Sequence, residues 1–131
     1  EIWRETVPVE RDFWLSGTGV GTYGPAMLHY QQRMREVHLN QAHSEYVQLA
    51  AEGGLLLLVP CAVALYAALH LARRRLKSDT RPLAWLRVGA VAGLAGIAVQ
   101  GVFETGLRIP ANALLAAVLA AIALHQPRNR D

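Results

Sequence analysis

His43 is the leading candidate for a catalytic residue in this chain, because of its type and its position. It lies near the start of the segment NQAHSEYVQLAAEG (residues 40–53), which we predict to be a helix that begins near Asn40, a suitable N-cap. On such a helix the imidazole shares a face with Ala50, above an apolar stripe. An imidazole near neutral pH can take a proton from a hydroxyl or donate a hydrogen bond to a phosphate. A structural histidine at an interface is the alternative, and the segment alone leaves both open.

Two other chemistries do not fit the residues around His43. Ser44 and Glu45 follow it directly, but neighbouring residues on a helix point in different directions and cannot form a nucleophilic relay. The spacing of His29, His38 and His43 is unlike that of zinc ligands on a helix. We therefore predict no metal and no cofactor.

A glycine-rich stretch, SGTGVGTYG at residues 16–24, is the second candidate. Its exposed backbone N–H groups, those of Gly19 and Gly21 among them, could cradle phosphate oxygens. The glycine spacing differs from the dinucleotide-binding fingerprint, and no Gly-Lys-Ser/Thr follows as in a P-loop. A turn that requires positive φ is the alternative interpretation.

The elements that must position these residues are apolar helices. The 131 residues are 53% hydrophobic and only 18% charged, which is typical of membrane proteins. Three weakly charged segments, at about 53–72, 85–103 and 109–126, approach the roughly 20 residues with which a helix crosses a bilayer. We expect an all-α polytopic membrane protein fragment whose three transmembrane helices (53–131) follow a luminal helix-loop-helix segment (1–52).

Charge sets the expected orientation. Residues 73–87 hold six Lys or Arg and one Asp, so the loop 73–84 is predicted to be cytoplasmic. Residues 1–52 and the turn at 104–108 then lie outside, and the C-terminus returns to the cytoplasm. The basic residues flank apolar segments and do not form a stripe on a folded face, which argues against nucleic-acid binding. Within residues 1–52 we expect a short helix that ends at Pro8 and another over residues 27–34.

Three stretches in this order resemble the C-terminal part of the O-antigen ligase and polymerase family of bacterial membrane glycosyltransferases. They are GTGVGTY at 17–23, AHSEYVQLAAEG at 42–53 with an apolar helix straight after it, and GVFETGLRIPANALL at 101–115. Ile2 and Trp3 resemble the helix that precedes the family's glycine loop. The resemblance implies that this chain corresponds to the last quarter to third of a polytopic inner-membrane enzyme.

The resemblance also implies a reaction and its residues. Such an enzyme takes glycan from an undecaprenyl-diphosphate carrier and transfers it to an acceptor hydroxyl, for example on lipid A core, at the periplasmic side. His43 matches the family's essential luminal histidine. The diphosphate contacts would come from Arg33, Arg35 or Arg108, for which solvated surface charge is the alternative, and from the amides of the glycine-rich stretch.

Two rival functions remain open. An O-antigen polymerase joins repeat units to each other, and only the identity of the acceptor separates it from a ligase. A small three-helix membrane scaffold without catalysis is the rival from another class. The enzyme interpretation predicts further apolar segments upstream of Glu1, and the fragment alone is expected to be inactive.

Overall fold

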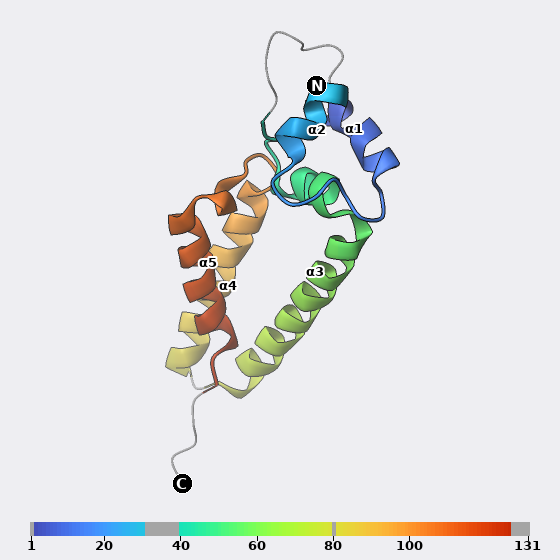
Figure 1. Cartoon of the computed structure of the whole chain (residues 1–131). Helices are drawn as coiled ribbons and strands as arrows, with labels where there is room; N and C mark the ends of the chain where they lie inside the picture. The colour runs from blue at the N-terminus through green and yellow to red at the C-terminus, as the bar shows by residue number, and fades with distance from the viewer. Residues whose placement is uncertain (1, 31–39, 80, 127–131) are drawn as a thin grey trace. The chain divides into compact units, whose positions relative to one another are not determined.

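The computed structural model describes residues 2–30, 40–79 and 81–126, with the side chain of Arg81 excepted. Within these ranges the chain is 79% helical and contains no strand, so the all-α prediction is confirmed there. The helices are α1 (Ile2–Asp12), α2 (Tyr23–Tyr30), α3 (Glu45–Ser78), α4 (Arg81–Gln100) and α5 (Pro110–Leu124), with a short 3₁₀ turn, η1 (Gly106–Arg108), before α5 (Figure 1).

The chain forms two compact units. The first comprises Glu1–Ala62 together with Gly101–Thr105, and the second comprises Val63–Gln100 together with Gly106–Asp131. The glycine-rich stretch and His43 belong to the first unit.

In the first unit α1 packs against α2 over a small core. Its buried apolar side chains come from α1, α2, the turn before α3 and the first part of α3, and they are Val9, Tyr23, Met27, Ala42 and Ala51. The hydroxyls of Thr6 and Tyr23 share a buried hydrogen bond of 2.7 Å that ties the two helices together. The predicted end of the first helix at Pro8 is wrong, because α1 continues to Asp12. Pro8 lies on the exposed face of α1. Water can therefore donate a hydrogen bond to the backbone carbonyl that has no partner because Pro8 lacks an N–H.

Helix α3 bends at Gly54, whose backbone is not helical (φ +54°, ψ −160°). A short helix from Glu45 to Gly53 therefore meets a long apolar one that continues to Ser78, beyond the predicted end at 72. The predicted helix start near Asn40 is wrong as well. The helix begins after Ser44, whose carbonyl accepts a hydrogen bond from the N–H of Gln48 (3.0 Å).

Helices α3 and α4 are each long and apolar enough to cross a membrane, over Glu45–Ser78 and Pro82–Gln100. Only 6% and 11% of their most apolar windows are buried by the rest of the chain. Helix α5 is as apolar but has 15 residues, fewer than the roughly 20 of a full span. The third predicted span is thus a shorter helix than the segment 109–126.

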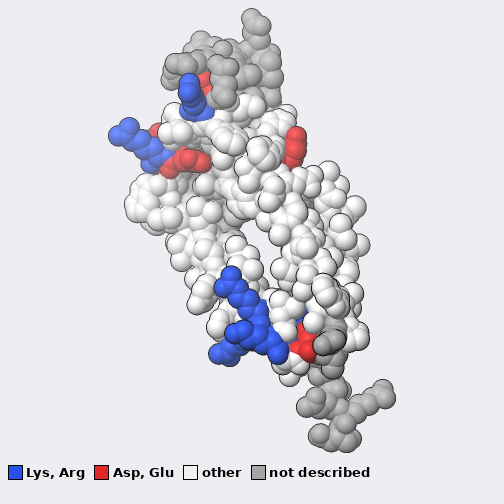
Figure 2. Space-filling model, turned by 180° about the vertical axis from the view of Figure 1, so that it is seen from behind, with Lys and Arg blue, Asp and Glu red and all other residues white. Residues whose placement is uncertain are grey.

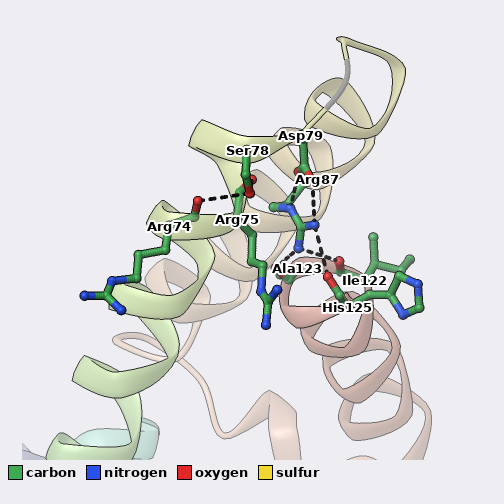
Figure 3. Close-up of polar contacts among 8 residues, drawn as sticks. All are labelled: Arg74, Arg75, Ser78, Asp79, Arg87, Ile122, Ala123 and His125. Atoms are coloured by element: carbon green, nitrogen blue, oxygen red, sulfur yellow. Dashed lines mark hydrogen bonds and ion pairs between the residues drawn. The ribbon is translucent and has the colours of Figure 1, made fainter. Parts of the chain in front are cut away.

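In the second unit a buried arginine joins α4 to α5 (Figure 3). Arg87 on α4 is 3% exposed, although its position in a basic stretch indicated a loop charge. Its guanidinium makes an ion pair with Asp79, Nε to Oδ2 at 2.6 Å. The same group donates hydrogen bonds to the carbonyls of Ala123 and His125 at the end of α5. A cation therefore satisfies carbonyls that the helix end leaves without partners.

Asp79→Asn should lower the thermal-unfolding midpoint at neutral pH, because Arg87 would then be buried without its counter-charge. The hydrogen bond from Arg87 holds the pKa of the Asp79 carboxyl below its usual 3.8. The pair therefore stabilises the fold above pH 3.8 and ceases to do so as the pH falls through the lowered pKa. Melting curves across this range should show the wild type and the variant converging in acid. A constant difference at every pH would contradict this role.

Exposed basic side chains gather at the end of α3 in the second unit (Figure 2). Arg73, Arg74 and Lys77 are exposed, and uncharged surface lies next to them. This is the charge distribution typical of a helix that ends at a membrane surface.

Candidate functional site

His43 lies in a turn directly before α3 and not on the helix, so the predicted shared face with Ala50 is wrong. Its φ of +50° is the one positive value among the described residues other than glycine. The carbonyl of Gly101 explains this turn, because it accepts hydrogen bonds from the N–H of Glu45 (2.8 Å) and the hydroxyl of Ser44 (3.4 Å). Such a conformation costs about 1–3 kcal/mol, so neighbouring contacts must hold it.

Three side chains hold the residues just before His43. The indole Nε1–H of Trp3 donates to the carbonyl of Ala42 (3.0 Å), and the hydroxyl of Thr105 donates to Oε1 of Gln41 (2.7 Å). The N–H of Ala42 in turn donates to Oε1 of Gln48, a buried side chain of α3 (3.2 Å). The turn is therefore fixed from α1, from α3 and from the segment 101–105.

The carboxylate of Glu52 occupies the centre of the glycine-rich stretch. Glu52 is 3% exposed, and its Oε2 accepts the N–H of Gly21 (3.0 Å) while its Oε1 accepts the side-chain amide of Gln48 (3.0 Å). The N–H of Gly19 donates to the backbone carbonyl of Glu52 (2.9 Å). The two amides that we expected to contact a diphosphate thus already have partners within the chain. They would have to release Glu52 before they could bind phosphate.

Positive φ explains the glycines at 17, 19 and 21. Gly17 packs so closely on the end of the first part of α3 that a Cβ there would overlap the backbone of Glu52 and Gly53. Beyond the bend, the N–H of Leu55 donates to the carbonyl of Trp14 (2.9 Å). The glycine-rich stretch and the residues before it thus pack on the bend in α3. The positive φ values of the glycines are those that the turn interpretation requires.

The imidazole of His43 faces Glu104. The side chains are 55% and 61% exposed, and His43 Nδ1 lies 3.7 Å from Glu104 Oε2. This distance is within the range of an ion pair when the imidazole is protonated, and it is longer than a hydrogen bond. The two residues are brought together because residues 101–105 fold against the His43 turn.

A hollow of about 350 Å³ opens beside His43. Its walls are Ile2, Trp3, Ala42, His43 and Phe103, and they are mostly apolar. Trp3 and Phe103 keep 46% and 66% of their surface exposed. The site therefore combines a proton-exchanging group, a carboxylate and two aromatic side chains around an open, apolar space.

None of the arginines predicted to contact a diphosphate is among the described residues that line this hollow. Arg33 and Arg35 lie outside the described residues. Arg108 lies in η1, in the second unit, and is exposed. In the described ranges no group of three or more His, Cys, Asp or Glu side chains is arranged to hold a metal ion.

Sequence reasoning missed Glu104 and Glu52. Glu104 stood in the turn that we expected on the same side as His43, but 61 positions along the chain separate the two residues. Glu52 was taken only as the end of a helix. A carboxylate next to two glycines and before an apolar run was the available signal, since a buried charge there requires donors nearby.

Comparisons with protein-family models, with curated proteins and with solved structures found no match to the chain. What defines the class of site is therefore its own geometry. It is an exposed His–Glu pair at the rim of an apolar, aromatic-lined hollow, in a helical chain with two helices that could cross a membrane.

Proposed function

We propose that this chain is part of a bacterial inner-membrane glycosyltransferase of the O-antigen ligase kind. It would move a glycan from an undecaprenyl-diphosphate carrier to an acceptor hydroxyl, with lipid A core as the acceptor. Three features support the proposal: the ordered resemblance of the stretches at 17–23, 42–53 and 101–115, the helices that could cross a membrane, and the exposed imidazole of His43 beside Glu104. The last of these is the observation that carries the chemistry.

In this mechanism His43 is the general base. The acceptor oxygen attacks the anomeric carbon, the bond from that carbon to the diphosphate oxygen breaks, and the diphosphate leaves with the bonding electrons. The hydroxyl proton passes to the imidazole, whose other nitrogen faces Glu104, so that the carboxylate stabilises the imidazolium. Direct displacement of this kind inverts the anomeric centre, and a trapped glycosyl-enzyme would contradict it.

The proposed orientation places residues 1–52 and the turn at 104–108 in the periplasm and the basic end of α3 in the cytoplasm. The exposed Arg73, Arg74 and Lys77 support it through the bias of Lys and Arg toward cytoplasmic ends. It puts His43 and Glu104 on the side of the membrane where such ligation takes place.

Transfer in cells tests the proposal. The full-length protein that contains this chain should restore glycan ladders on lipid A core when it is expressed in cells that lack their own ligase. Ladders in these cells would establish ligation. If the protein instead lengthens glycan chains when it is expressed in cells that lack a polymerase, and restores no ladder in the ligase-deficient cells, the reaction is that of a polymerase. The absence of both effects at normal protein levels would favour a non-catalytic membrane protein.

Glu104→Gln should lower the transfer rate about tenfold, because the neutral amide stabilises an imidazolium less than a carboxylate does. Glu104→Asp should retain more activity than the amide variant. Glu10→Gln provides the control, since Glu10 lies in the first unit on α1 and does not line the hollow. Rates would be compared in membranes with equal protein levels. Equal rates for Glu104→Gln and the wild type would remove Glu104 from the mechanism.

A further inference from the structure

The hollow beside His43 has a fixed aromatic wall. The indole N–H of Trp3 is bound to the carbonyl of Ala42, so the ring cannot turn without losing a hydrogen bond. The ring nevertheless remains 46% exposed. Phe103 adds a second exposed aromatic from a distant part of the sequence. Because α1 and the segment 101–105 both hold the His43 turn, the backbone positions that carry Trp3, His43 and Phe103 are held close together.

The charge of the described residues around this hollow disfavours the diphosphate end of the donor. Among the residues that the structure describes, none that lines the hollow is Lys or Arg, and the carboxylate of Glu104 lies next to His43. Within this described lining a diphosphate would meet the carboxylate of Glu104 and no Lys or Arg, which is electrostatically unfavourable. The hollow therefore suits a neutral ligand.

A pyranose ring has the matching chemistry. One face of the ring carries C–H bonds whose partial positive charge is attracted to the negative face of an aromatic ring, while its hydroxyls need polar partners. The hollow offers aromatic walls and, at its rim, an imidazole and a carboxylate. Ligand pockets run from about 300 to 1,000 Å³, so a hollow of about 350 Å³ matches one sugar ring better than a long lipid.

We propose that the Trp3–Phe103 hollow binds a neutral sugar ring of the acceptor and presents its hydroxyl to His43. This inference rests on the proposed function, and it assigns the hollow to the acceptor and not to the carrier-linked donor. The diphosphate of the donor then binds elsewhere than at the described lining of the hollow. Trp3 and Phe103 would determine the affinity for the acceptor and would take no part in the proton transfer.

Binding can be measured without any transfer reaction. The full chain in a detergent free of sugar is mixed with maltotriose as the neutral probe, and saturation-transfer NMR detects the ring C–H protons. Phe103→Leu removes one aromatic wall and should weaken binding about five- to tenfold. Trp3→Phe keeps a ring but loses the N–H, and Trp3→Leu loses both, so binding should fall from the first variant to the second.

The controls are Trp14→Leu and Phe13→Leu, which remove exposed aromatics of the same unit that do not line the hollow. They should bind maltotriose as the wild type does. Farnesyl diphosphate is the anionic, lipidic probe, and it should not displace the sugar. Three results would each overturn the assignment. The first is displacement of the sugar by farnesyl diphosphate in a way that depends on Phe103. The others are sugar binding that is unchanged in the Trp3 and Phe103 variants, and no sugar binding at all.

The two proposals fail in different ways. If maltotriose binds through Trp3 and Phe103 while the full-length protein transfers no glycan, the sugar site stands and the transferase proposal fails. If the full-length protein transfers glycan but Phe103→Leu leaves the KM for the acceptor unchanged, the transferase proposal stands and the sugar site fails.

Discussion

His43→Ala in the full-length protein should abolish the glycan ladder on lipid A core. Among the described residues that line the hollow, His43 is the one whose side chain can act as a general base. General-base catalysis contributes about 10²- to 10⁴-fold, so residual transfer should fall below what a gel detects. The ladder is read after silver staining, with protein levels measured in the same membranes.

His43→Asn is the sharper variant, because alanine also disfavours the backbone at this position. The φ of +50° is left-handed, and asparagine tolerates that region better than most residues. If the asparagine variant keeps its thermal stability and still transfers no glycan, the loss of activity is due to the missing imidazole and not to misfolding. His29→Ala is the matched control, since His29 is an exposed histidine of α2 in the same unit. A ladder retained in His43→Asn would return His43 to a structural role.

Gly17→Ala should have the largest effect on stability. A Cβ at Gly17 would overlap the backbone of Glu52 and Gly53, and the positive φ of +64° disfavours any side chain. The atoms that the Cβ would meet are backbone atoms, which cannot move away cheaply, so we expect a loss of about 3 kcal/mol or more. The bend in α3 and the hydrogen bonds to Glu52 should fail with it. Thermal unfolding in detergent and the yield of folded protein measure this loss.

Gly21→Ala separates overlap from conformational strain. Gly21 also has a positive φ, +78°, but a Cβ there would meet nothing within 4 Å. Only the strain of a left-handed backbone remains, about 1–2 kcal/mol. Gly17→Ala should therefore be clearly the less stable variant. Equal stability of the two would show that the glycine-rich stretch does not pack on Glu52 and Gly53 as described here.

Hydropathy alone anticipated most of the helical architecture. Long runs with few charges predict apolar helices whatever their partners, because an unpaired charge in an apolar setting is costly. The bounds were less accurate. Pro8 falls on an exposed face and does not end α1, and Arg87 is buried because Asp79 and the end of α5 supply its partners. His125, just after α5, lies 38 positions from Arg87, so reading neighbouring residues could not identify it as a partner.

The sequence by itself determined which residue types are available for chemistry: a histidine before a helix and glycines that can adopt positive φ. Only the tertiary structure decided how they are used. It placed Glu104 beside His43, bent α3 at Gly54 and filled the glycine-rich stretch with the carboxylate of Glu52. The physical reason is that helical periodicity and glycine preferences act over a few residues. The contacts of the site join residues tens of positions apart, and these form only when the segments pack.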